Sequence, residues 1–86
     1  RRLMLKVLFF AQTRELLDCD ALELDFEPAL ASLETLRSQL AARGDRWDLA
    51  LQRDKLLVAV NQTMSPWDTE IKDGDEVAFF PPVTGG

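Results

Sequence analysis

The chain has 86 residues, of which 47% are apolar and 29% charged, and ten Lys or Arg against fifteen Asp or Glu give a net charge of −5 at pH 7. A chain of this length has room for one hydrophobic core and no second domain. The acidic balance argues against binding to nucleic acid, which depends on Lys and Arg, and no apolar run reaches the roughly 20 residues of a membrane-spanning helix.

Two strands joined by a short helical segment are predicted for the first 26 residues. Residues 3–10 are apolar except for Lys6, which is typical of a strand. Residues 11–17 are predicted to form a helical turn. Residues 21–26 alternate apolar and acidic side chains, which predicts a second strand with one buried face. The polar break at residues 18–20 favours a hairpin-like return between the two strands.

The main helix is predicted at residues 33–43. Ser32 is a favourable N-cap, Glu34 places an acid in the first turn, and Gly44 ends the helix. Apolar residues recur at helical spacing along one face: Leu33, Leu36 and Leu40. This stripe is predicted to face the core, with an exposed partner-binding helix as the alternative.

The second half of the chain is predicted to return to the sheet. Trp47 would lie in the core or at its rim, and Asp73-Gly74 is a strong turn signal. The predicted elements are a short helix capped by Asp45, a buried strand at residues 56–60, a loop at residues 61–68, a short strand near Ile71 and a last strand at residues 76–80.

The order of these elements predicts an α+β fold. An N-terminal hairpin, a helix across the sheet and a late strand fit a β-grasp, or ubiquitin-like, roll, although other topologies share the pattern. Such a roll has a mixed sheet of four to five strands, one main helix packed across it, and its first and last strands parallel at the centre. We expect residues 1–80 to form this domain and residues 81–86 an extended tail.

The residues that usually perform catalysis are scarce. There is no histidine, which excludes Ser-His and Cys-His pairs and histidine zinc sites. Cys19 is the one cysteine, so no internal disulfide is possible and a reducing cytoplasm fits. Its two acidic neighbours indicate an incidental thiol rather than a redox one. Asp73-Gly74-Asp75 is short of the ligands of a calcium loop, so we expect a turn and no metal site.

The last six residues, Pro81-Pro82-Val83-Thr84-Gly85-Gly86, are the most informative segment. Two prolines end the strand and favour an extended chain, and two glycines without side chains suit entry into a narrow channel. The group presented at Gly86 is a carboxylate, a poor electrophile that must be activated, for example as an acyl-adenylate made with ATP by a partner enzyme. The alternative is an idle, disordered tail.

Residues 73–86 (DGDEVAFFPPVTGG) closely resemble the C-terminus of the small, sulfur-carrier subunits of molybdopterin synthase, in the ubiquitin-like β-grasp sulfur-carrier family. Residues 6–12 (KVLFFAQ) and 59–62 (AVNQ) share the resemblance, which extends over nearly the whole chain.

The resemblance implies a carrier rather than a catalyst. An E1-like enzyme would adenylate Gly86 with ATP, and a sulfur donor would convert it to a thiocarboxylate. The tail, with Gly85 as the unencumbered neighbour, would insert into the large synthase subunit. There the sulfur would pass to cyclic pyranopterin monophosphate to form the dithiolene of molybdopterin. The implied assembly is a cytoplasmic heterotetramer of two large and two small subunits, and the carrier itself binds no cofactor.

Three other functions share parts of the pattern. A sulfur carrier of another pathway, such as thiazole synthesis, would use the same tail chemistry. A ubiquitin-like modifier would join its glycine to a lysine amine. A plain β-grasp interaction module would have an inert tail.

Period-two alternation predicts a docking patch at the root of the tail. In the first strand Leu3, Leu5, Val7 and Phe9 share one face, and in the last strand Val77 and Phe79 do. Phe10 and Phe80 then fall on the opposite, solvent side as exposed aromatics, and Met64 could extend the patch. We expect Phe10, Met64 and Phe80 to contact both the activating enzyme and the large subunit. Coverage by the chain's own short helix or loop is the alternative.

Overall fold

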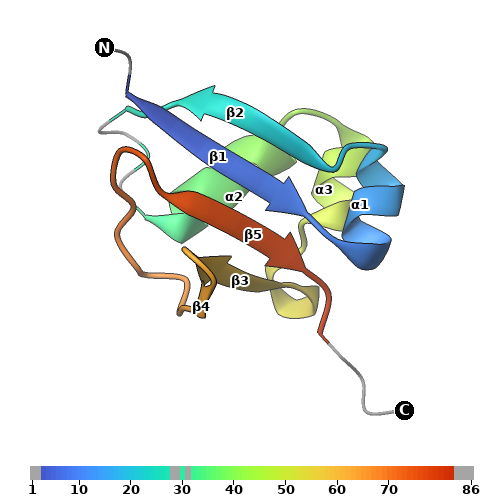
Figure 1. Ribbon diagram of the computed structural model, residues 1–86. Helices are drawn as coiled ribbons and strands as arrows, with labels where there is room; N and C mark the ends of the chain where they lie inside the picture. Colours follow the sequence, from blue (N-terminus) through green and yellow to red (C-terminus); the bar gives the residue numbers. More distant parts are fainter. Residues whose placement is uncertain (1–2, 28–29, 31, 83–86) are drawn as a thin grey trace.

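The computed structural model describes residues 3–27, 30 and 32–82, and it contains one mixed sheet (Figure 1). The strands lie in the order β2-β1-β5-β3-β4. Strand β5 pairs parallel with β1, and the other neighbours are antiparallel. The strands are β1 (Met4–Phe9), β2 (Ala21–Asp25), β3 (Leu57–Val60), β4 (Thr63–Met64) and β5 (Glu76–Phe80). The predicted α+β fold, with the first and last strands parallel in the middle of the sheet, is confirmed.

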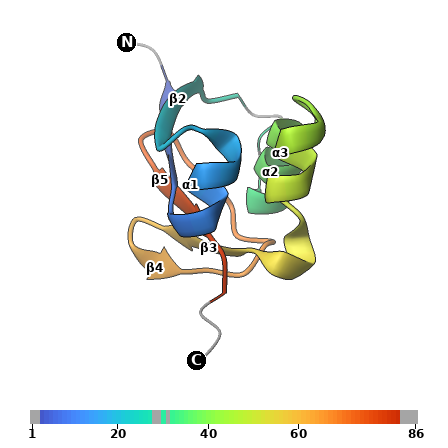
Figure 2. The ribbon, with the colours of Figure 1, turned by 90° about the vertical axis from the view of Figure 1, so that its right-hand side faces the viewer.

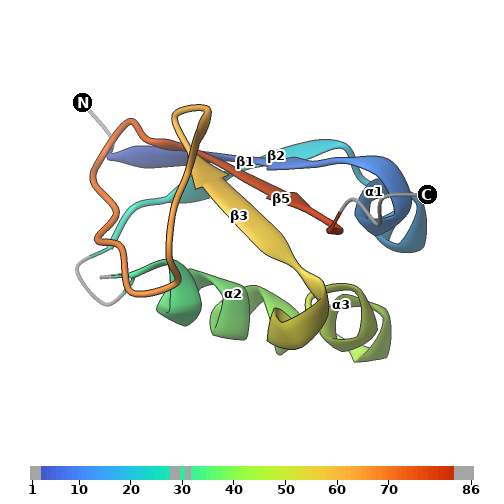
Figure 3. The same cartoon turned by 90° about the horizontal axis from the view of Figure 1, so that it is seen from below.

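The main helices cover one face of the sheet (Figure 3). The helical segments are α1 (Ala11–Leu17), α2 (Leu33–Ala41), α3 (Asp45–Ala50) and a short 3-10 helix, η1 (Arg53–Lys55). Leu33, Leu36 and Leu40 of α2 are buried, so the predicted core stripe is confirmed. Ser32 caps this helix as predicted, because its hydroxyl accepts a hydrogen bond from the Thr35 N–H at 3.3 Å.

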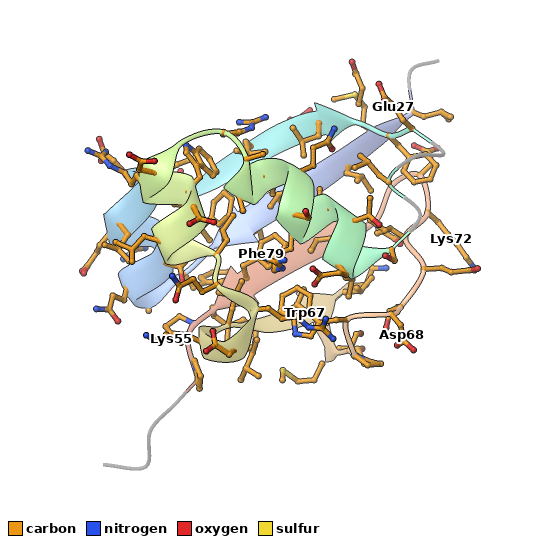
Figure 4. All side chains as sticks on the ribbon, turned by 180° about the vertical axis from the view of Figure 1, so that it is seen from behind. Glu27, Lys55, Trp67, Asp68, Lys72 and Phe79 are labelled. Atoms are coloured by element: carbon orange, nitrogen blue, oxygen red, sulfur yellow. The ribbon has the colours of Figure 1, made fainter. Side chains whose placement is uncertain are left out.

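Aromatic rings connect the sheet to the layer that covers it. Phe79 stacks on Phe9 with 6.0 Å between ring centroids, and on Trp67 at 6.1 Å. Figure 4 shows Phe79 and Trp67 side by side. Trp47 is half-buried and meets Phe9 edge-on at 5.8 Å, with the Arg43 guanidinium over its indole ring. Trp47 therefore lies at the rim of the core.

The helix layer is joined to the end of α3 by a hydrogen-bonded ion pair. Arg37 donates to both carboxylate oxygens of Glu34, at 3.1 and 2.5 Å, and to the Leu51 carbonyl at 2.8 Å. Arg53 lies 3.7 Å from the same carboxylate. The hydrogen bond from Arg37 holds the pKa of Glu34 below its ordinary value, against the opposing effect of burial.

The turn before β5 is structural, as predicted. Asp73 accepts the Met4 N–H at 2.8 Å, and Asp75 accepts the Lys72 N–H at 2.8 Å. Gly74 has a φ of 87°, a left-handed conformation that glycine adopts without steric cost. Among the described residues, no group of three or more His, Cys, Asp or Glu is placed to hold a metal ion. The same part of the chain has no helix long and apolar enough to cross a membrane.

The short strand was predicted in the wrong place. The region of Ile71 has only an isolated bridge, at Glu70, whereas β4 lies inside the predicted loop. The chain reverses there because Asn61 and Gln62 both adopt left-handed conformations, with φ of 50° and 70°. A two-residue turn of this kind usually contains glycine, so the sequence held no clear signal for it.

Three element boundaries also differ from the predictions. Helix α2 ends at Ala41, two residues earlier than predicted. Gly44, not Asp45, is the N-cap of α3, because Asp45 is already helical. Leu3, predicted on the buried face, is 47% exposed because it precedes the first paired residue of β1.

Candidate functional site

The outer face of the sheet, opposite α2 and α3, presents an apolar row across four strands. The register aligns Leu8 of β1 with Ala78 of β5, Ala78 with Ala59 of β3, and Ala59 with Met64 of β4. On β1 and β5, Leu8 and Ala78 alternate with buried residues, so this part of the row is the outward counterpart of the core, whereas Ala59 of β3 is itself only 7% exposed. In Figures 2 and 3 neither α2 nor α3 lies on this side of the sheet.

A shallow groove of about 610 Å3 follows this row to the point where β5 ends. We call it the outer groove. It is lined by Leu8, Phe10, Ala11, Ala59, Gln62, Met64, Glu76, Ala78, Phe80 and Pro81. Most of this lining is apolar and uncovered by the described chain, which is typical of a surface that binds a partner.

The three residues of the predicted docking patch meet in the outer groove. Phe10 is 44% exposed and occupies the N-cap position of α1, while Met64 is 57% exposed on β4. Phe80 was predicted to be exposed, but it is half-buried. The reason is its place on β5, between β1 and β3, where Leu57 is its direct neighbour. All three residues line the outer groove, and their role in docking stays a prediction.

Two polar lining residues were not singled out as site residues from the sequence. Glu76 lies on the predicted solvent side of the last strand, and Gln62 lies in the predicted loop at residues 61–68. Gln62 was missed because the sequence did not predict the left-handed turn that folds β4 back onto β3. Glu76 could have been found, because it shares the alternation of Ala78 and Phe80.

The tail begins at one end of the outer groove. Pro81 is half-buried and lines the groove, and Pro82 is exposed. The Phe10 N–H donates to the Phe79 carbonyl at 3.2 Å, which holds the start of α1 beside the end of β5. The remaining predicted tail residues, Val83, Thr84, Gly85 and Gly86, lie outside the described residues.

Cys19 takes no part in this surface. It is half-buried after α1, and its thiol donates a 3.4 Å hydrogen bond to the Ala21 carbonyl. The residues around it are Arg14, Glu15, Asp18 and Asp20. Within the described residues, the thiol therefore contributes a hydrogen bond at the turn into β2.

Known proteins have sequences similar to this one. Residues 7–86 match the model of the ThiS family. The chain is 59% identical over 83 residues to the molybdopterin synthase sulfur carrier subunit of Haemophilus influenzae, a match that covers 96% of this chain and 100% of that protein. It is 58% identical to the corresponding Escherichia coli subunit, with the same coverage.

Solved structures share the fold. A Haloferax volcanii protein has a TM-score of 0.79 at 27% identity, over 98% of this chain and 87% of that one. One chain of the solved complex of subunits 1 and 2 of molybdopterin-converting factor from Helicobacter pylori has a TM-score of 0.66 at 25% identity. The match covers 96% of this chain and 99% of that one. The chain is thus similar to small proteins of one fold, one of which was solved with a protein partner.

Proposed function

The chain belongs to the ThiS family, and on that premise we propose that it is the sulfur-carrier subunit of a molybdopterin synthase. The observation that supports this most directly is the apolar outer groove, which extends to Pro81 at the start of the tail. A carrier needs a surface that lets other proteins hold it while its tail enters their active sites. It needs no catalytic base of its own, and the sequence contains no histidine.

The proposed chemistry takes place at the Gly86 carboxylate. An E1-like enzyme transfers AMP from ATP to this carboxylate and releases pyrophosphate. Sulfur at the oxidation level of sulfide, released by the sulfur donor, then attacks the acyl carbon and expels AMP, so that a thiocarboxylate replaces the carboxylate. In the large synthase subunit each thiocarboxylated chain transfers one sulfur to cyclic pyranopterin monophosphate, and water releases the chain with its carboxylate restored. Two such transfers supply the two sulfurs of the molybdopterin dithiolene. ATP is thus a substrate of the activating enzyme, and the carrier holds no cofactor.

The tail residues have separate proposed roles. Pro81 and Pro82 direct the chain away from the sheet, because proline cannot continue the β5 ladder. Val83 and Thr84 span the distance to the partner's active site. Gly85 leaves the backbone next to the reactive carbon free of side-chain bulk. Residues 1–80 serve as the domain that positions this tail.

The outer groove is the proposed docking site for both partners. Phe10, Met64 and Phe80 would contact first the E1-like enzyme and then the large subunit, so the two complexes exclude one another. The solved Helicobacter pylori complex supports the choice of a large-subunit partner. We further propose a heterotetramer of two large and two small subunits in the cytoplasm, where a single free cysteine stays reduced.

Intact mass spectrometry tests the central step. After incubation with ATP, the activating enzyme and a sulfur source, the chain should gain the mass difference of one oxygen replaced by sulfur, located at Gly86. Deletion of Gly86, or one residue added after it, should abolish the gain. A stable isopeptide adduct on other proteins would instead indicate a modifier. The thiocarboxylated chain should also yield molybdopterin with the large subunit, and failure there would indicate a carrier of another pathway.

A further inference from the structure

The outer groove has one charged residue in its described lining, Glu76. It occupies the first position of β5, whereas Phe80 and Pro81 lie at the opposite end of that strand. Gln62 is the other lining residue with a long polar side chain. The groove therefore has an apolar end beside the tail and an acidic end away from it.

The Glu76 carboxylate is half-buried and has no ion pair or hydrogen bond within the described part of the chain. The nearest cation by register is Lys6 of β1, which is aligned with Glu76 on one side and with Glu23 of β2 on the other. Lys6 is exposed and forms no described ion pair with either carboxylate. This row of the sheet thus has two carboxylates and one ammonium group, and it remains net acidic.

The backbone of Glu76 is held rigidly by the neighbouring turn. Its N–H donates to the Asn61 side-chain oxygen at 3.0 Å, and its carbonyl accepts the Asn61 N–H at 2.8 Å. The Asn61 amide group also donates to the Asp75 carboxylate at 3.0 Å. The carboxylate of Glu76 therefore projects from a fixed point, so its position relative to the apolar end of the groove is set before any partner binds.

A partner that covers the outer groove must remove water from this carboxylate. An unpaired carboxylate in a closed interface weakens binding, and this penalty is offset only if the partner provides a positive group. A purely apolar partner surface could pack against Phe10, Met64 and Phe80, but it would leave the Glu76 carboxylate without a positive group to pair with. A partner without a cation at this place is therefore disfavoured, which makes Glu76 a determinant of specificity.

We propose that the Glu76 carboxylate pairs with an arginine or lysine of the large synthase subunit, next to the apolar side chains that this subunit inserts between Phe10, Met64 and Phe80. The inference rests on the proposed function, because it takes the large subunit as the occupant of the groove. It adds which groups the partner must present: apolar side chains at the Phe80 end of β5 and a positive group at the Glu76 end. The net charge of −5 favours the same kind of partner through long-range attraction.

Titration of the large subunit with Glu76→Gln tests the pairing, since this change removes the charge and keeps the shape. The Kd should rise about tenfold at low salt, and the difference from the unaltered chain should shrink at high salt. Glu23→Gln is the matched control, because Glu23 lies in the same row of the same face but outside the groove lining. Its Kd should stay within about twofold.

The inference is overturned if Glu76→Gln binds the large subunit as tightly as the unaltered chain does. It is also overturned if Glu23→Gln weakens binding equally, because the effect would then come from the overall negative charge of the chain and not from a specific ion pair. Urea unfolding of both variants should give the same midpoint as the unaltered chain, which separates recognition from folding. Glu76→Arg should bind more weakly still, and a Lys-to-Glu or Arg-to-Glu change at the partner's contacting residue should restore its affinity. Molybdopterin formation by the unaltered chain is measured in parallel, because its absence contradicts the proposed function instead.

Discussion

The two faces of one sheet differ sharply although they are built from the same strands. Phe9 and Phe79 point inward, are at most 1% exposed and stack on one another beneath the helices. Phe10 and Phe80 follow them directly in sequence and line the outer groove. The inner face is thus closed by the chain's own helices, whereas the outer face is uncovered within the described residues and is the docking surface that we propose. Under that proposal, adjacent aromatic residues have opposite roles, one in stability and one in recognition.

The largest expected effect is on the inner face. Phe79→Ala should lower the free energy of unfolding by about 3–5 kcal/mol, because it removes a ring packed between Phe9 and Trp67. Urea unfolding followed by tryptophan fluorescence measures this loss. A cost below about 1 kcal/mol would contradict the division between the two faces.

The neighbouring residue on the outer face should show the reverse balance. Phe80→Ala should cost only about 1 kcal/mol in unfolding free energy, since its ring is half-buried. Its Kd for the large subunit should rise at least about tenfold, as expected for an aromatic anchor. Phe80→Asp should weaken binding to the activating enzyme as well. Unchanged binding of both partners by a folded Phe80→Asp chain would refute the proposed docking site.

A smaller effect concerns pH and the helix layer over the inner face. The pKa of Glu34 is lowered in the folded chain, so the unfolded chain takes up a proton more readily. The stabilisation by Glu34 is therefore complete well above its ordinary pKa of 4.5 and is lost as the pH falls through the lower, folded-state value. Unfolding curves across acidic pH should show a shallower decline for Glu34→Gln. The same slope as in the unaltered chain would contradict this assignment, and Glu23→Gln is the control.

The smallest effect on stability is expected at the margin of the groove. Met64→Ala should change the unfolding free energy by less than about 0.5 kcal/mol, because Met64 is 57% exposed on a two-residue edge strand. Its Kd for the large subunit should still rise about threefold to fivefold, because the side chain forms one wall of the groove. Equal losses in stability and affinity would show that Met64 acts through folding instead.

Much of the fold could be predicted because its signals are local. The apolar run of β1, the alternation of β2 and the stripe of Leu33, Leu36 and Leu40 each report a period within one element. The short strand β4 was missed because its turn relies on left-handed Asn61 and Gln62, and hydrogen bonds to Asp75 and Glu76 hold Asn61 in place. Such contacts join residues 14 or 15 positions apart and leave no local pattern.

The candidate site was predicted in part for the same reason. Alternation placed Phe10 and Phe80 on one face, and the tail motif was visible in the residues themselves. The place of Glu76 at the groove's acidic end was not, because it depends on which strands flank β5.

The sequence alone determined the alternating faces, the main helix and the chemical character of the tail, because each follows from side chains close together along the chain. Only the tertiary structure decided the half-burial of Phe80, the turn that brings Gln62 and Met64 to the groove, and the position of Glu76, whose carboxylate has no ion pair among the described residues. These features arise from the register between strands that are distant in sequence, and pairing across a sheet is set by the whole core rather than by any one segment.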